Sequence, residues 1–215
     1  MKILTFDTAL NKTYISLSTD NKIIEKPVIE NSNDKYHSAF LIQEIANILK
    51  RNNLKMQDIN AIGINTGPGS FTGIRACTTV GRVIAQQTDA KLIGVSSLEI
   101  LSKINAGKTL VTLDARKNSA YCAVYRDGDE IEPPHLLKTE ELIEKAKNIT
   151  VISDSALYKK LEENNIKAIN YEAENYPLNE YLANIVFERL TKGLDDFNWA
   201  KVKPLYIQPP SIFGK

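Results

Sequence analysis

The sequence repeats one pattern of strands and turns at a constant spacing, and this limits the fold more than any other feature. The segment Leu4-Thr5-Phe6-Asp7-Thr8 resembles Val111-Thr112-Leu113-Asp114-Ala115, and matched positions are 107 residues apart. The same spacing relates Asn11 to Asn118, Tyr14 to Tyr121 and Asp20 to Asp127. An ungapped repeat of this kind indicates that one supersecondary unit has been duplicated.

Each copy begins with a short apolar strand, bends at its aspartate and continues as a second strand. Together with the helical segments that follow, this predicts an α/β fold with mixed sheets and two lobes. We expect an N-terminal lobe over residues 1–106 and a second lobe over residues 107–215. Since no glycine occurs between Gly128 and Gly193, the second lobe is expected to be a degenerate copy. Its C-terminal segment can pack back on the first lobe, and residues 203–207 are expected to form a final edge strand.

A glycine-rich segment, Gly67-Pro68-Gly69-Ser70-Phe71-Thr72-Gly73, lies between an apolar run and a segment of helical spacing. This order predicts a strand, a loop and a helix. The N–H groups of such a loop and the N-terminus of its helix suit an anion. However, the loop has no Walker-type lysine and is not GxGxxG. From the glycines alone we favour the alternative, a tight turn that packs closely against its surroundings.

Asp7 and Asp114 occupy the bends of the two copies, and we expect them to face each other across a cleft between the lobes. Carboxylates in that position suit Mg²⁺ and phosphates, although each can equally complete a tight turn. His37 and His135 lack the spacing of a metalloprotease, so no metal site is expected. The candidate contacts to a nucleotide or phosphate are Asp7, Thr8, Gly67, Pro68, Gly69, Ser70 and Asp114.

A helix expected from about Asp34 to Lys50 is apolar over an unusually wide arc. It carries one line of apolar residues at Leu41, Ile45 and Ile48, and a second at Ile42, Ala46 and Leu49. The helix is either covered deeply by its own lobe or buries a second face against a partner, and the sequence leaves both open. The helix after the glycine loop carries small residues every four positions, at Gly73, Cys77, Gly81 and Ala85.

The composition excludes several classes of protein. A formal net charge of +1 gives no global attraction to nucleic acid or membrane. Cys77 and Cys122 lack CxxC spacing and are typical of core residues in a reducing compartment. Asp7 interrupts the first apolar run too early for a signal peptide, and no apolar stretch is long enough to span a membrane. We therefore expect a cytoplasmic chain.

Several segments together carry a resemblance to a known family. In order they are FDTA, KYHSAFLIQEI, INTGPGSFTGIR, GVSSLE, LDARKNSAYCAVY and KPLYI. They resemble the TsaB (YeaZ) family over essentially the whole chain. Members of this family are inactive relatives of the transferase TsaD. The resemblance implies a duplicated actin-like ATPase (RNase H-like) fold, shared with sugar kinases and Hsp70, which agrees with the internal repeat.

The resemblance also implies a function. It implies a bacterial, non-catalytic scaffold that pairs with TsaD, with TsaE as a further partner, to make threonylcarbamoyl-adenosine beside the tRNA anticodon. TsaD would hold the metal and transfer the threonylcarbamoyl group, and tRNA would be reached only through the complex. No cofactor is expected on this chain alone, while ATP or ADP with Mg²⁺ can bind at the interface of the complex. Without TsaD the same surface can form a homodimer.

The family pairs through its first two long helices, which assigns a partner interface to them. The residues so implied are Tyr36, His37, Phe40, Leu41, Ile45, Ile48, Ile74, Cys77, Thr78 and Gly81. The glycine loop is then a remnant of an ancestral phosphate loop. The metal-binding HxxxH pair of the transferase would fall near His37, but Asn33 and Leu41 occupy the flanking positions. Two alternatives remain open, an independent ATPase or kinase-like protein and a metallopeptidase.

Overall fold

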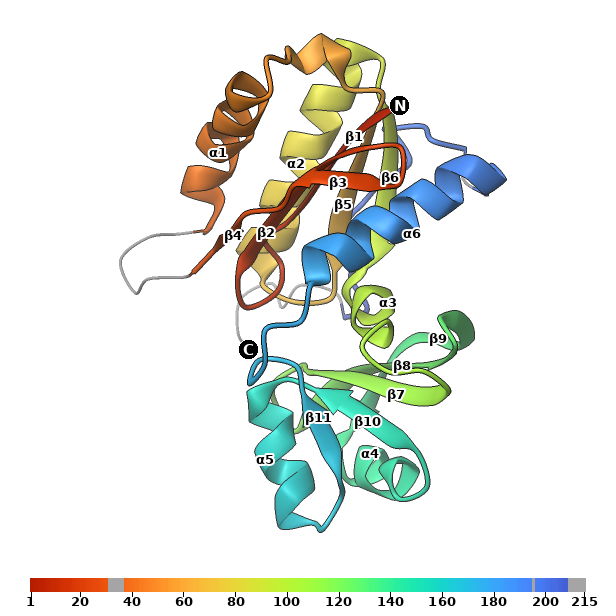
Figure 1. The fold of residues 1–215 in the computed structure, drawn as a ribbon. Coiled ribbons are helices and arrows are strands. Elements are labelled where there is room, and N and C mark those ends of the chain that lie inside the picture. The colour runs from red at the N-terminus through yellow and green to blue at the C-terminus, as the bar shows by residue number, and fades with distance from the viewer. Residues whose placement is uncertain (31–36, 195, 209–215) are drawn as a thin grey trace. The chain divides into compact units, whose positions relative to one another are not determined.

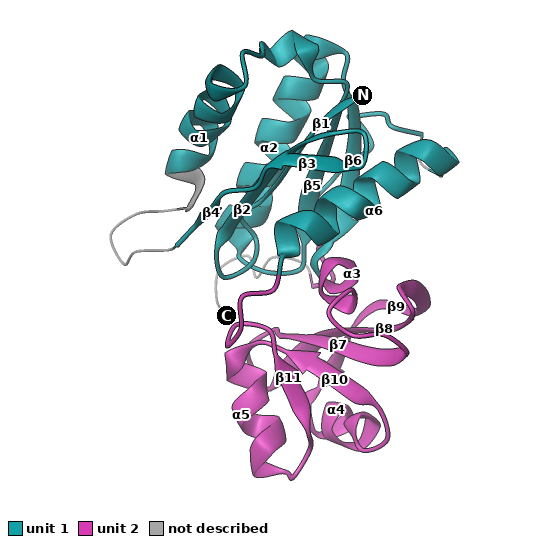
Figure 2. Ribbon diagram, viewed as in Figure 1, with its two compact units in different colours: residues 1–97, 177–204 teal, residues 98–176, 205–215 magenta. Residues whose placement is uncertain are grey.

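The computed structural model describes residues 1–30, 37–194 and 196–208 of the chain (Figure 1). They form two compact units, each with one sheet and the helices that cover it (Figure 2). Unit 1 comprises Met1–Ser97 and Pro177–Pro204. Unit 2 comprises Leu98–Tyr176 and the described residues from Leu205 onward. The predicted α/β class with mixed sheets is confirmed.

Unit 1 is built on a sheet whose strands lie in the order β3-β2-β1-β5-β6, with β4 also pairing with β2. β1 is antiparallel to β2 and parallel to β5, and β5 is parallel to β6. The strands are β1 (Lys2–Asp7), β2 (Thr13–Thr19), β3 (Lys22–Glu25), β4 (Val28–Ile29), β5 (Ala61–Gly67) and β6 (Lys91–Ser96). The helices are α1 (His37–Arg51), η1 (Met56–Asp58), α2 (Phe71–Thr88) and α6 (Leu178–Lys192).

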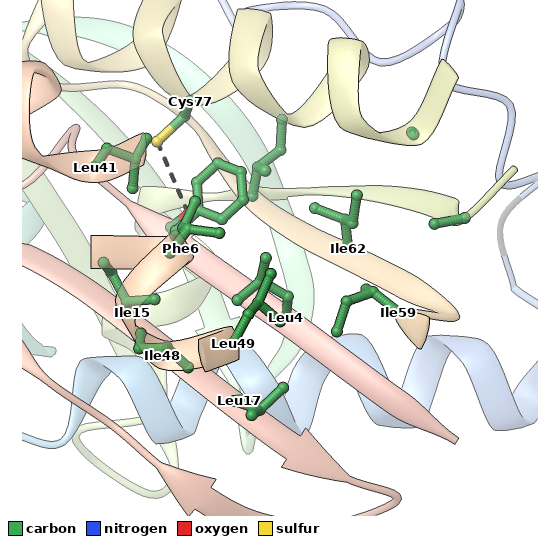
Figure 3. Close-up of a cluster of buried hydrophobic side chains, with 14 of the residues drawn as sticks. Leu4, Phe6, Ile15, Leu17, Leu41, Ile48, Leu49, Ile59, Ile62 and Cys77 are labelled. Atoms are coloured by element: carbon green, nitrogen blue, oxygen red, sulfur yellow. Dashed lines mark hydrogen bonds between the residues drawn. The ribbon is translucent and has the colours of Figure 1, made fainter. Parts of the chain in front are cut away.

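The core of unit 1 follows from the alternation of side chains along its strands. Helices α1 and α2 cover one face of the sheet and α6 covers the other (Figure 1). Alternate strand residues such as Leu4, Phe6 and Ile15 pack under α1 and α2, as Figure 3 shows. On the opposite face, Gly63 allows α6 to approach closely, because a Cβ at this position would lie 2.3 Å from Cγ2 of Val186.

Unit 2 has a five-stranded sheet in the order β11-β10-β7-β8-β9. Its strands are β7 (Lys108–Asp114), β8 (Ser119–Arg126), β9 (Asp129–Lys138), β10 (Thr150–Ser153) and β11 (Ala168–Asn170). Helices α4 (Thr139–Ala146) and α5 (Ser155–Glu163) pack on one face through Leu142, Leu157 and Leu161. The short helix α3 (Ser97–Ser102) lies where the chain passes from unit 1 to unit 2.

The two units repeat one topology. In unit 2, β7 is antiparallel to β8 and parallel to β10, β8 is antiparallel to β9, and β10 is parallel to β11. This is the arrangement that β1, β2, β3, β5 and β6 have in unit 1. In the chain order α1 and α2 flank β5 in unit 1, as α4 and α5 flank β10 in unit 2. The duplication inferred from the repeated sequence pattern is therefore present in the strand order.

The sequence alignment of the two copies is nevertheless wrong by one residue in the first strand. Phe6 pairs with Ile15 under α1 and α2, and the corresponding pair under α4 and α5 is Thr112 with Cys122. The second strands thus keep the spacing of 107 residues, while the first strands are 106 apart. Because a shift of one residue moves a side chain to the other face of a sheet, Asp114 is not the counterpart of Asp7.

The division of the chain also differs from two contiguous lobes at residues 1–106 and 107–215. Residues 98–106 belong to unit 2, and the segment Pro177–Pro204 returns to unit 1. The return is explained by α6, whose buried side chains Leu182, Ile185 and Val186 cover a sheet face that would otherwise be exposed.

The prediction for the last described segment is wrong. Residues 203–207 do not form an edge strand. The N–H of Leu92 in β6 donates to the Phe197 carbonyl at 3.3 Å instead, and Trp199 and Val202 pack against the unit 1 core. None of the helices within residues 1–30, 37–194 and 196–208 combines the length and apolarity of a membrane-spanning segment.

Candidate functional site

The glycine loop joins the carboxyl end of β5 to the N-terminus of α2, as the sequence predicted. β5 ends at Gly67, whose φ of 101° lies in the range that favours glycine. Ser70 is the N-cap of α2, and its Oγ accepts the N–H of Gly73 at 3.2 Å. A serine cap of this kind stabilises the start of a helix because it satisfies one of its free N–H groups.

The bend that follows β1 fills the concave side of the loop. A Cβ at Gly73 would lie 1.8 Å from the carbonyl oxygen of Thr8, and a Cβ at Gly69 would lie 2.4 Å from that of Ala9. Two hydrogen bonds fix this contact, from Ser70 N to the Ala9 oxygen at 2.8 Å and from Thr8 Oγ1 to the Gly73 oxygen at 2.7 Å. Both glycines are therefore needed for close packing of the loop against β1.

Three N–H groups of the loop have acceptors within the protein. Gly67 N donates to Asn65 Oδ1 at 2.8 Å, and the N–H groups of Ser70 and Gly73 are used as described above. A phosphate would have to displace these contacts, which weakens the loop as a phosphate cradle. The geometry favours the packing turn, and contact of Thr8, Gly67, Pro68, Gly69 and Ser70 with a nucleotide stays a prediction.

Asp7 lies beneath this loop in a buried, polar cluster. Its side chain is 1% exposed, and its Oδ1 accepts the N–H groups of Ala9 at 2.6 Å and Leu10 at 3.4 Å. Burial raises the pKa of this carboxyl from 3.8 to about 6, while Asn65 and the two N–H groups oppose the rise. Asn65 acts on Asp7 by proximity, because the buried atoms Asp7 Oδ2 and Asn65 Nδ2 form no hydrogen bond of ordinary geometry among the described residues. A carboxylate so enclosed has no surface from which to bind Mg²⁺ or a phosphate.

Cys77 of α2 completes the cluster and links it to β1. Its Sγ accepts the N–H of Thr8 at 3.1 Å and lies 3.8 Å from the Phe6 carbonyl oxygen. The dashed line in Figure 3 marks the contact with Phe6. Burial, together with the nearby charge of Asp7, raises the pKa of this thiol to about 12. A thiol with such a pKa stays protonated, so Cys77 acts as a packing residue.

Asn65 and Ser97 are the residues of this cluster that the sequence did not single out. Ser97 Oγ donates to Asn65 Oδ1 at 2.9 Å, and both side chains are fully buried. The signal that could have revealed Asn65 is its place at the end of an apolar strand, directly before the glycines. Ser97 offered no comparable signal, because it meets Asn65 only through the pairing of β5 with β6.

Asp114 ends β7 in unit 2 and has a different environment. It is half-buried, and its N–H donates to Asp154 Oδ2 at 2.6 Å. Asp154 caps α5 through its other oxygen, which accepts the Leu157 N–H at 2.9 Å. Since Asp7 and Asp114 belong to different units, their expected meeting across a cleft stays a prediction.

Within the described parts of the chain, no three His, Cys, Asp or Glu side chains are grouped so that they could hold a metal ion. His135 lies beside Cys122, with 3.6 Å between Nε2 and Sγ, and its Nδ1 contacts the Pro133 oxygen at 2.8 Å. Burial raises the pKa of the Cys122 thiol to about 11. This pair therefore belongs to the packing of unit 2, and His37 is described only as the first residue of α1.

The structure places three of the proposed interface residues of α1 inside unit 1. Leu41, Ile45 and Ile48 are at most 2% exposed and belong to its core (Figure 3). Phe40 is half-buried, and Tyr36 lies outside the described residues. The wide apolar arc is thus largely explained by coverage within the unit. Its exposed remainder is Ala46 and Ile42, and the Ile42 side chain is 65% exposed.

The proposed interface residues of α2 are buried as well. Ile74, Cys77, Thr78 and Gly81 all lie on the buried side of the helix. One line of exposed residues recurs every four positions along α2, at Phe71, Arg75, Thr79 and Val83. Arg75 stacks over the Phe71 ring, with its Cζ 5.3 Å from the ring centroid. Because the sheet-facing sides of α1 and α2 are buried, these four residues and Ile42 point away from the sheet, and we call them the outer face.

Comparison with known proteins agrees with this architecture. The family model described as "TsaD: tRNA N6-adenosine threonylcarbamoyltransferase" matches residues 27–187. The tRNA threonylcarbamoyladenosine biosynthesis protein TsaB of Escherichia coli (strain K12) is 29% identical over 160 residues, which are 70% of this chain and 68% of that protein. TsaB of Bacillus subtilis (strain 168) is 29% identical over 129 residues, which are 59% of this chain and 56% of that protein.

A solved structure extends the match to almost the full length. YeaZ from Pseudomonas aeruginosa has a TM-score of 0.75 with this chain at 19% identity, covering 95% of this chain and 99% of that one. At this identity the likeness establishes a common fold. The chain therefore belongs to the TsaD family, and its sequence and fold place it with the TsaB (YeaZ) proteins.

Proposed function

We propose that this chain is a non-catalytic subunit in the biosynthesis of threonylcarbamoyladenosine in tRNA, and that it pairs with a TsaD-like transferase. Support for the pathway comes from the TsaB relatives in Escherichia coli and Bacillus subtilis, which are named for it. In this proposal the partner transfers the threonylcarbamoyl group, and tRNA is reached through the complex. The complex works in the cytoplasm.

The non-catalytic role rests on one observation, the filling of the glycine loop by the bend after β1. A Cβ at Gly73 or Gly69 would lie only 1.8 or 2.4 Å from a main-chain oxygen of that bend, so the side of the loop that faces the bend has no room for a phosphate. The buried carboxyl of Asp7 has no access to a ligand. A nucleotide with Mg²⁺ would then bind where the partner completes the site, at the interface of the complex.

The pairing surface in this proposal is the outer face of α1 and α2. Ile42 and Val83 are 65% and 53% exposed, and Phe71 is 46% exposed. Large apolar side chains grouped on neighbouring helices favour association, because burial removes them from water. The buried residues Leu41, Ile45, Ile48 and Cys77 support this surface from below by fixing the two helices on the sheet.

Further parts of the proposal concern the other partners. A TsaE-like ATPase would join the pair, and in the absence of the transferase the outer face would hold two copies of this chain together. The homodimer and the pair with the transferase would each bury Ile42 and Val83, so these two associations would compete for one surface.

Co-purification tests the proposal directly. The chain is mixed with a TsaD-like transferase, and complex formation is followed by size-exclusion chromatography and calorimetry. Ile42→Glu combined with Val83→Glu should abolish the complex, because it places two charges in an apolar contact. Ile131→Glu is the matched control, since Ile131 is 49% exposed on β9 of unit 2. Equal loss of binding in both variants, or none in either, would reject this surface.

The alternatives give different results with the isolated chain. An independent ATPase or kinase predicts tight binding of ATP with Mg²⁺, and that binding should be lost in Asp7→Ala. A metallopeptidase predicts one equivalent of bound metal in elemental analysis. Either finding would overturn the proposal that this chain has no catalytic centre of its own.

A further inference from the structure

The bend between β7 and β8 has a backbone conformation that residues other than glycine rarely adopt. Arg116, Lys117 and Asn118 follow one another with φ angles of 62°, 49° and 55°. A left-handed conformation is unfavourable for any residue with a Cβ, and least so for asparagine. Three such residues in succession therefore store strain that the surrounding structure has to offset.

Backbone hydrogen bonds hold this turn in place. Ala115 N donates to the Ser119 oxygen at 2.9 Å, and Ser119 N donates to the Arg116 oxygen at 3.0 Å. The Asn118 oxygen accepts the N–H of Thr139, the first residue of α4, at 3.0 Å. The main chain of the turn is thus fixed to its own hairpin and to the neighbouring helix.

The equivalent bend in unit 1 is used differently. There Ala9 and Leu10 are buried, and the glycine loop packs directly on Ala9. In unit 2 the helix after the fourth strand is reached without a glycine loop, and Arg116, Lys117 and Asn118 are not buried. Since packing accounts for the first bend and not for the second, the strain of the second bend points to a role at the surface.

The turn presents two cations that are not neutralised by direct contact. Neither Arg116 nor Lys117 has an ion pair among the residues that the structure describes. The Arg116 charge lies near Tyr121, where it opposes the rise in pKa that burial causes. The Asp114 carboxylate acts on the same tyrosine in the opposite sense, so it offsets part of the positive field beside the turn. The turn is therefore suited to one or two anionic groups and not to a long stretch of nucleic acid.

We propose that Arg116 and Lys117 contact phosphodiester groups of the tRNA that the complex holds. This inference rests on the proposed function and adds a contact made by this chain itself. A guanidinium can hold two oxygens of one phosphate, and a neighbouring ammonium can neutralise the next. Two contacts are too few for RNA binding by the isolated chain, which fits its net charge of +1.

The test compares two double variants in the complex with the transferase. Arg116→Ala/Lys117→Ala removes the turn cations, and Lys159→Ala/Lys167→Ala removes two lysines elsewhere in unit 2. Binding of tRNA is measured by filter retention over a range of salt concentrations. Because log K, with K the association constant, falls as log salt rises, removing one phosphate contact should make the slope shallower by about 0.7–0.9. The same change should weaken binding about 5-fold near 0.15 M salt. The turn variant should bind up to about 30-fold more weakly by the same arithmetic, and the control should match the wild type.

Three results would overturn the inference. One is an unchanged slope in the turn variant, and another is an equal change in both variants. The third is loss of the complex with the transferase in the turn variant alone, which would make the turn a protein contact. Urea unfolding of each variant excludes loss of fold, and Arg116→Gln/Lys117→Gln repeats the test if the alanine variant is unstable. If the wild-type chain forms no complex at all, the proposed function fails and this inference fails with it.

Discussion

The substitution Gly73→Ala tests how the glycine loop is packed. The new Cβ would lie 1.8 Å from the Thr8 oxygen, 2.6 Å from its carbonyl carbon and 3.2 Å from the Ala9 Cα. All three are main-chain atoms, so no side chain can rotate away to make room. Either the bend after β1 or the first turn of α2 has to move, and such a movement breaks the hydrogen bond from Thr8 Oγ1 to the Gly73 oxygen.

The magnitude follows from two opposing effects. In an open helix, replacing glycine by alanine stabilises the protein by roughly 1 kcal/mol. Overpacking of a tight site costs about 1–3 kcal/mol and occasionally more. Here the new Cβ would meet main-chain atoms, so no change of a side-chain rotamer can relieve the contact. We therefore expect Gly73→Ala to lower the free energy of unfolding of unit 1 by about 3 kcal/mol, a large share of the roughly 5–15 kcal/mol typical of a domain.

Urea denaturation followed by tryptophan fluorescence measures this effect. The chain has one tryptophan, Trp199, which packs on the unit 1 core and therefore reports on that unit. Gly193→Ala is the control, because Gly193 has a φ of 62° and a Cβ at this position would meet no atom within 4 Å. Its expected cost is about 1 kcal/mol, from the left-handed backbone alone. If the free energy of unfolding of Gly73→Ala lies within about 0.5 kcal/mol of the wild-type value, the bend does not pack closely against the loop and our interpretation is refuted.

Two further predictions concern the buried groups around this loop. The native carboxyl of Asp7, with its pKa raised from 3.8 to about 6, binds a proton more tightly than the unfolded chain, so its burial costs up to about 3 kcal/mol above pH 6. That cost disappears as the pH falls toward 3.8. The substitution Asp7→Asn should therefore raise the free energy of unfolding at pH 7.5 and should no longer raise it near pH 4. A difference between variant and wild type that does not change with pH would contradict the raised pKa of Asp7. Both buried thiols, Cys77 and Cys122, have raised pKa values, so a disulfide reagent at pH 8 should label neither in the native protein and both after unfolding. Rapid labelling of the folded chain would show that one of the two units opens readily.

The order of the elements was accessible from the sequence because it depends on local patterns. The strand before Gly67 and the helix after Ser70 follow from apolar runs and glycines. The duplication also emerged, since its strands and turns repeat in order. The one-residue error at Asp114 arose because identity matches do not show which face of a sheet a side chain occupies. Only the pairing of Thr112 with Cys122 revealed it.

Contacts between distant segments set the limit of prediction. The apolar positions of α1 suggested that the helix has more apolar surface than its own lobe can bury. In the structure, however, Leu41 and Ile48 pack in the core with residues of β1 and β2. The filling of the glycine loop depends on Thr8, which lies 65 residues before Gly73 in the chain. Neither contact leaves a local signal, so the buried and exposed sides of α1 and α2 could be separated only in three dimensions.

The central claim is that this chain assists a transferase without catalysing a step itself. Reconstituted threonylcarbamoyl transfer to tRNA measures it directly, with the TsaD-like partner and the TsaE-like ATPase present and this chain added or omitted. We expect transfer to require the chain, to persist with Asp7→Asn, and to fail with Ile42→Glu/Val83→Glu. Transfer at the full rate in the absence of the chain would contradict the claim.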